Sequence, residues 1–198
     1  MPTLLRVLLL AALPIIAFVG GGALMMRHTG RDHVRAVLDN SVRNGTLTKA
    51  DSAHLNMRWR EGYDREAFRR YWNALDDKAR GIEERFLEFD LVFPFLYGGA
   101  LAASLLMAWA ALGRPVHPAW VLLPVLILVA ADWTENLVQL GQVRRWNAGG
   151  DAALQAGWIG VASAATRVKC AFIGVTALML VGLLVWNLVA AVRAPRTR

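Results

Sequence analysis

The sequence predicts an all-α integral membrane protein: an up-down four-helix bundle with a partly helical hydrophilic loop between its first two helices. Of the 198 residues, 56% are hydrophobic and only 19% are charged, which is more apolar than an ordinary soluble domain. The charges are clustered, and they leave runs as long as the roughly 20 helical residues that cross a bilayer. Four such runs occur, and one long hydrophilic stretch, residues 27–88, follows the first of them.

The four apolar runs differ in how many charges they contain. Residues 91–112 and residues 170–192 contain none. The first run has only Arg6, whereas the third has Asp132 and Glu135 in its second half. The predicted spans cover about residues 4–26, 91–112, 119–143 and 158–192 of a single membrane domain, 1–198.

The first run also fits a cleavable signal peptide, because Arg6 precedes an apolar core and small residues follow at 20–23. The run continues to Met26, however, and a signal core is typically about 7–15 residues long. We therefore interpret it as a retained anchor. Basic residues outside the loop are almost evenly divided between the two membrane faces, so their count does not decide the orientation. The signal-anchor character of the first run favours cytoplasmic termini and an extracytoplasmic loop.

The loop, residues 27–88, carries 13 Lys or Arg and 11 Asp or Glu. These charges nearly cancel, as on solvated helix surfaces, and most other basic residues flank the spans, where they anchor helices in headgroups. The net charge of +7 therefore does not indicate a nucleic-acid partner. The single cysteine permits no intrachain disulfide.

Capping signals predict short helices inside the loop. Thr48 and Asp51 have the spacing of a capping box and predict a short helix at about residues 53–57. Asp64 is expected to cap an amphipathic helix whose apolar side chains follow at helical spacing. That face could lie at the membrane interface or pack onto the rest of the loop. The apolar side chains are Phe68, Tyr71, Trp72 and Leu75.

Another helix is expected to start at Asp76 or Asp77, to present Ile82, Phe86 and Phe89 on one side, and to run unbroken into the second span. The next connection, residues 113–118, contains two prolines and allows only an antiparallel hairpin. The connection at about residues 144–157 has room for a partial helical turn.

Polar residues in three spans are predicted to meet at one membrane face. In an up-down bundle, the start of the second span, the end of the third and the start of the fourth lie at the same face. Asp132, Glu135, Asn136 and Gln139 share one side of a helix. An Asp near the middle of a span costs about 2.5–3.5 kcal/mol in lipid, so this side should face the bundle.

Basic residues at the start of the fourth span supply the counter-ion. Arg167 and Lys169 lie about 200° apart around a helix, so only one can point straight at the acids. We predict that Arg167 points inward. On the second span, Asp90 and Tyr97 share a stripe with Pro94, which frees a carbonyl near Asp90 for another donor. Three carboxylates against two bases leave one negative charge, which a proton or a ligand could neutralise.

Three interpretations of this cluster remain open. It can be a polar knot that fixes helix register. It can be a pocket through which an accessory or scaffold protein binds a membrane lipid, an apolar small molecule or a partner membrane helix. It can be a lipid-modifying active site in which Asp132 or Glu135 is the general acid or base and Arg167 steadies an anionic group. No nucleotide-binding or zinc motif occurs, so no metal or other cofactor is predicted.

Four stretches, GYDREAFRRYWNAL, FLEFDLVFPFLYG, DWTENL and TRVK, together resemble a group of bacterial four-span membrane proteins of uncharacterised function. The resemblance implies a bacterial inner membrane and transfers no activity. It makes Lys169 a rival to Arg167 as the counter-ion. The recurring polar residues that it implies are Asp90, Asp132, Glu135, Asn136, Thr166 and Lys169.

Overall fold

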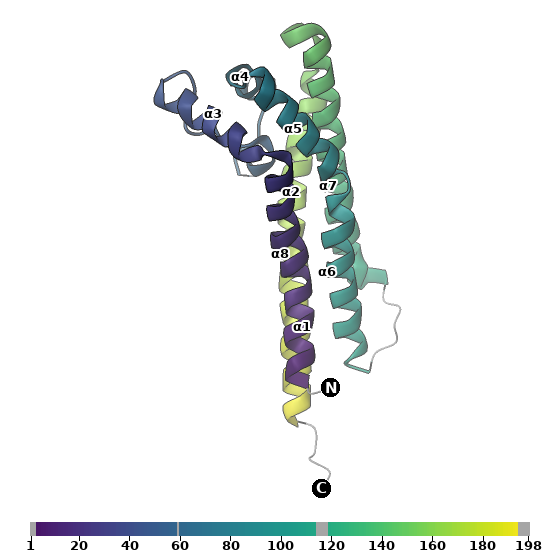
Figure 1. Cartoon of the computed structure of the whole chain (residues 1–198). Helices are drawn as coiled ribbons and strands as arrows, with labels where there is room; N and C mark the ends of the chain where they lie inside the picture. The colour runs from purple at the N-terminus through teal and green to yellow at the C-terminus, as the bar shows by residue number, and fades with distance from the viewer. Residues whose placement is uncertain (1–2, 59, 114–118, 194–198) are drawn as a thin grey trace.

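The computed structural model describes residues 3–58, 60–113 and 119–193, which form helices and turns and no strand, so the predicted all-α fold is confirmed. Figure 1 shows a long bundle with a smaller helical region at one end. The elements are α1 (Thr3–Ile15), the π-helical turn η1 (Ile16–Gly20), α2 (Gly21–Thr29), α3 (Arg31–Arg43), the 3-10 turn η2 (Leu55–Met57), α4 (Arg65–Ala74), α5 (Asp77–Asp90), α6 (Phe93–Ala110), α7 (Ala119–Gly149), the 3-10 turn η3 (Gly150–Ala153) and α8 (Ala156–Arg193).

Four helical segments of the described chain are long and apolar enough to cross a membrane. They correspond to the four predicted spans, and each is longer than predicted, although the second ends at Ala110, before the predicted residue 112. At about 1.5 Å per residue, α7 is about 46 Å long and α8 about 57 Å, against a hydrocarbon core of about 30 Å. The end of the α7–α8 hairpin therefore projects beyond the membrane, and the predicted partial turn in the connection is η3. The predicted 113–118 hairpin lies largely outside the described residues.

The first span is interrupted and then ends sharply. Pro14 lies inside α1 and cannot donate a backbone hydrogen bond, and the wider π-helical turn η1 begins two residues later. Gly30 ends α2 with a left-handed backbone (φ 78°), which glycine adopts without steric cost. The chain then turns into α3, which leaves the bundle (Figure 1). Helix α3 was not predicted from the sequence, because only Val34 and Leu38 form its buried apolar stripe.

Only one half of the predicted capping box forms, and no α-helix follows it. The backbone N–H of Asp51 donates to Thr48 Oγ1 at 3.1 Å, and the Thr48 hydroxyl donates to the Asp51 carboxylate at 2.9 Å. A capping box needs its acid to accept from the backbone of the first residue. The Asp51 carboxylate instead pairs with Arg58 (3.3 Å) and Arg70 (3.0 Å). The predicted helix is therefore only η2.

The other two caps in the loop are confirmed. Asp64 accepts from the backbone of Ala67 at 2.8 Å and starts α4, and Asp76 accepts from Ala79 at 2.7 Å and starts α5. The apolar face of α4 is almost fully buried, so it packs onto the protein and does not lie at the membrane interface. This core joins α3, α4 and α5 to the projecting ends of α7 and α8. Phe89 is the exception on α5, with 47% of its surface exposed.

Candidate functional site

The junction of α5 and α6 positions the site. Because Pro94 has no N–H, the carbonyl of Asp90 has no partner in the helix, and Asn136 Nδ2 of α7 donates to it at 3.1 Å. The next carbonyl, that of Leu91, accepts from Trp133 Nε1 at 2.9 Å. The predicted freed carbonyl near Asp90 is therefore present. The expectation of an unbroken helix is wrong, because the chain turns for two residues here.

Lys169 of α8 lies between the two acids of α7. Its Nζ is 3.0 Å from Asp132 Oδ1, and it also pairs with Glu135 Oε2. Glu135 Oε1 accepts from the Thr166 hydroxyl at 2.8 Å and from Gln139 Nε2 at 3.2 Å. Asp132, Glu135 and Asn136 are each at most 4% exposed. The predicted acidic side of the third span therefore faces the bundle.

The prediction that Arg167 points inward is wrong. Arg167 is exposed, and its Nη2 donates to the carbonyl of Glu61 at 2.8 Å. The rotation of α8 explains why Lys169, and not Arg167, is the counter-ion. Thr166 and Lys169 are three residues apart and share the side of α8 that faces α7. Ser163 is on the same side and accepts from the backbone N–H of Tyr63 at 2.9 Å. The Thr-x-x-Lys spacing places Thr166 and Lys169 on one side of the helix, but it does not say whether that side faces the acids.

Tyr97 belongs to the cluster, as predicted. Its hydroxyl donates to Asp132 Oδ2 at 2.6 Å, so both oxygens of that carboxylate have partners. The Tyr97 ring packs edge-on against the ring of Phe18 in the first span, with centroids 5.5 Å apart. It also packs, at a tilt, against the ring of Phe93, with centroids 5.3 Å apart. Phe18 lies in the π-helical turn η1. The first span is thus connected through Tyr97 to the acidic cluster.

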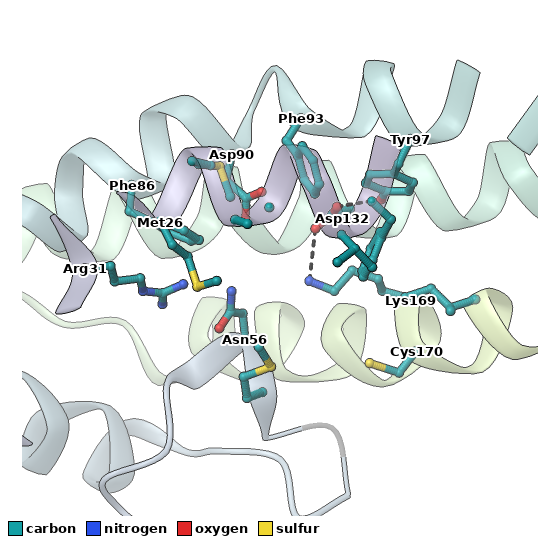
Figure 2. Close-up of a pocket in the computed structure, with 17 residues that line it drawn as sticks. Met26, Arg31, Asn56, Phe86, Asp90, Phe93, Tyr97, Asp132, Lys169 and Cys170 are labelled. Atoms are coloured by element: carbon teal, nitrogen blue, oxygen red, sulfur yellow. Dashed lines mark hydrogen bonds and ion pairs between the residues drawn. The ribbon is translucent and has the colours of Figure 1, made fainter. Parts of the chain in front are cut away.

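A cavity of about 330 Å³ adjoins this cluster. Its walls come from the first span, the α5–α6 junction, the middle of α8 and the turn η2, with single residues from α3 and α7 (Figure 2). Most lining side chains are apolar or aromatic, and charged residues occur at Asp90, Asp132, Lys169 and Arg31. Pockets for small molecules typically measure about 300–1,000 Å³ and combine an apolar lining with a few polar groups. This cavity has that character.

The carboxylate of Asp90 has no hydrogen-bond or ion-pair partner among the described side chains, although the residue is only 4% exposed. In Figure 2 it points into the cavity. The one ammonium of the cluster, Lys169, is bound to Asp132 and Glu135. Since Arg167 is turned away, three carboxylates face one base. The excess is two negative charges, not the one that was predicted.

The loop also contributes to this cavity, which was not predicted from the sequence. Arg31 of α3 donates to Glu83 from Nε (2.9 Å) and Nη2 (3.2 Å), and its guanidinium lies 3.5 Å from the centre of the Phe86 ring. Asn56 of η2 reaches the cavity from the opposite side. No periodicity or motif in residues 27–61 indicated these two positions.

The donor set does not favour a metal ion. Asp132 and Glu135 are paired with Lys169, so a divalent cation would have to displace an ammonium. Within the part of the chain that the structure describes, no group of three His, Cys, Asp or Glu side chains could hold a metal ion.

The fold and the site define a class: a four-helix integral membrane protein with an ion-paired polar cluster and an adjoining apolar cavity. Comparison of the chain with protein-family models, with curated proteins and with solved structures found no match. The resemblance to the bacterial four-span group therefore stays a prediction.

Proposed function

We propose that this protein is an accessory membrane component that binds a lipid or another apolar small molecule in the cavity beside Asp90. The observation that supports this most directly is an apolar cavity of about 330 Å³ with a buried, unpaired carboxylate in its wall. A polar knot that only fixed helix register would need neither the cavity nor the third carboxylate. The first span already packs beside α6 and α8, which favours a small occupant over a partner helix.

A cavity-filling variant tests this proposal. Gly22 lines the cavity, and a Cβ there would lie 3.9 Å from Phe93, so Gly22→Leu is expected to fill the space without a backbone clash. Gly20→Leu is the matched control, because Gly20 is in the same span and does not line the cavity. Mass spectrometry of the protein purified in mild detergent should show a copurifying ligand in the wild type and in Gly20→Leu, and none in Gly22→Leu. A wild type free of ligand would contradict the proposal.

A membrane-embedded enzyme that acts on a lipid is the second candidate. Its general acid or base would be Asp90, because both oxygens of Asp132 and of Glu135 are already engaged, which argues against the roles expected for them from the sequence. Asp90→Asn should then keep the fold and the bound lipid and stop its conversion, measured by mass spectrometry of lipid extracts. Conversion that persists in Asp90→Asn would exclude this candidate.

We further propose a bacterial inner membrane, with cytoplasmic termini and an extracytoplasmic 27–88 loop. The first turn of α1 and the last turn of α8 lie at the same end of the bundle (Figure 1), so one reporter decides the orientation. A fluorescent protein fused after the last residue should fold and fluoresce only if that end is cytoplasmic. A periplasmic phosphatase fused at the same place should then be inactive.

A further inference from the structure

Asp90 is held in place without any compensation for its charge. Its backbone carbonyl is bound by Asn136, so the position of the residue is determined, while its carboxylate is turned into the cavity (Figure 2). A buried carboxylate without a partner is strongly unfavourable. A proton or a positively charged occupant must therefore offset it.

The bases nearest to the cavity are already committed. Lys169 is bound to Asp132 and Glu135, and Arg31 is bound through two hydrogen bonds to Glu83. Four carboxylates thus face two bases. His54, which is 3.2 Å from Glu83, could reduce the imbalance by at most one charge. Both described bases that line the cavity are thus engaged elsewhere and do not pair with Asp90.

The rest of the cavity suits a cation with an apolar body. Asn56 lines the wall opposite Asp90, and its side-chain oxygen is buried without a hydrogen-bond donor. In Figure 2 the nitrogen of Asn56, not this oxygen, points towards Asp90, so the acceptors that face the cavity here are the carboxylate oxygens of Asp90, which an ammonium group, having only donors, would match. Phe18 and Phe93 contribute aromatic rings to the same wall, and aromatic faces attract cations.

We infer that the ligand of this cavity is a membrane-soluble amine whose protonated nitrogen pairs with Asp90 and whose apolar body lies against the first span. This inference rests on the proposed function, because it names the chemical class of the ligand for the same cavity. An anionic headgroup is excluded by the excess of carboxylates. Beside a neutral apolar molecule, Asp90 would have to be neutralised by a proton, and the ligand would gain no ion pair from the carboxylate.

Three probes of one shape separate charge from apolar fit: 1-adamantanamine, 1-adamantanol and 1-adamantanecarboxylate. Thermal unfolding of the full-length protein in lipid nanodiscs is measured at neutral pH with each. The amine should raise Tm, the alcohol should raise it less, and the carboxylate should not raise it. Asp90→Asn should weaken amine binding at least about tenfold. Asp39→Asn, the same exchange at an exposed position outside the cavity, should leave it unchanged.

Cys170 provides a readout that needs no substitution, should Asp90→Asn fail to fold. It is the only cysteine of the chain and it lines the cavity. The amine should slow its alkylation by N-ethylmaleimide at least about tenfold more than the alcohol does.

Equal protection and equal stabilisation by the amine and the alcohol would overturn the inference and leave the proposed function intact. Amine binding that is undiminished in folded Asp90→Asn would also overturn it. If no probe binds and the wild type also copurifies with no ligand, the inference and the proposed function both fail.

Discussion

Asn136 on α7 donates its side-chain hydrogen bond to the backbone carbonyl of Asp90, at a distance of 3.1 Å. Pro94 creates the need for this bond, because it lies four residues after Asp90 and has no N–H to offer. One side chain thus completes the backbone hydrogen bonding of another helix and at the same time holds the unpaired carboxylate at the cavity wall.

The first prediction is that Asn136 and Pro94 are energetically coupled. Asn136→Ala leaves the buried carbonyl unsatisfied and should destabilise the protein by about 1–3 kcal/mol. Replacing Pro94 with Ala in that variant restores an N–H and should recover part of the loss. Thermal unfolding in detergent of the wild type, both single variants and the double variant measures the coupling. Strictly additive effects would exclude it, and Asn147→Ala, at an exposed amide, should cost less than about 0.5 kcal/mol.

The second prediction separates the two bases of α8. Lys169→Met removes the only ammonium next to two buried carboxylates and should cost about 3–5 kcal/mol. Arg167→Met removes one exposed hydrogen bond to the carbonyl of Glu61 and should cost no more than about 1 kcal/mol. The measurement is thermal unfolding in the same detergent. Equal losses, or a larger loss for Arg167→Met, would contradict the arrangement in the structure.

The acidic face of α7 could be predicted from the sequence because it needs only helical periodicity and the cost of charge in lipid. Asp132, Glu135 and Asn136 are buried as those two arguments require. The counter-ion could not be chosen in the same way, since Arg167 and Lys169 satisfy both arguments equally well. Which of the two bases faces the acids depends on the rotation of α8 about its axis. A hydrogen bond between Ser163 and the loop backbone at Tyr63 stabilises that rotation. A contact across 100 residues leaves no local pattern.

The part of the cavity wall that comes from the loop shows the same limit. Arg31 and Asn56 reach it because Gly30 turns the chain into α3 and because η2 folds back onto the bundle. Both depend on the tertiary packing of a mixed-charge loop. The fold, the acids and a possible pocket beside them can therefore be predicted from the sequence, but the loop residues that line the cavity cannot.

The third prediction concerns two adjacent glycines of α6. A Cβ on Gly98 would lie 2.6 Å from Val129 Cγ2, whereas a Cβ on Gly99 would meet nothing within 4 Å. Alanine is favoured over glycine inside a helix by about 1 kcal/mol. Gly99→Ala should therefore leave Tm unchanged or raise it. Gly98→Ala should lower Tm, because valine is stiff at χ1 and cannot easily move its methyl group.

Of this pair, only Gly98 is thus a site of close approach between α6 and α7. The same thermal unfolding measurement checks it, with Gly99→Ala as the control for helix propensity. A higher Tm for Gly98→Ala than for Gly99→Ala would show that α6 and α7 are not packed as closely as in the structure.

The fourth prediction is that Asp51 makes the order of the loop depend on pH. Burial by itself would raise the pKa of the Asp51 carboxyl. The hydrogen bonds from Arg70 and Thr48, together with the charges of Arg70 and Arg58, outweigh burial and hold the pKa below its ordinary value of 3.8. A carboxyl whose pKa is lower in the folded state than in the unfolded state stabilises the fold above the unfolded value. That contribution is lost as pH falls through the lower folded-state pKa.

Asp51→Asn keeps the shape of the side chain and removes its charge, so the variant should lack this pH dependence. Hydrogen exchange of residues 48–58 should be faster in the variant than in the wild type at about pH 6, and the difference should shrink towards zero at about pH 2.5. Comparing both proteins at each pH cancels the intrinsic dependence of exchange on pH. Because Arg58 also donates to backbone carbonyls in this turn, some protection should survive in both proteins at low pH. A difference that grew as the pH fell would mean that Asp51 is not paired with these arginines in the folded protein.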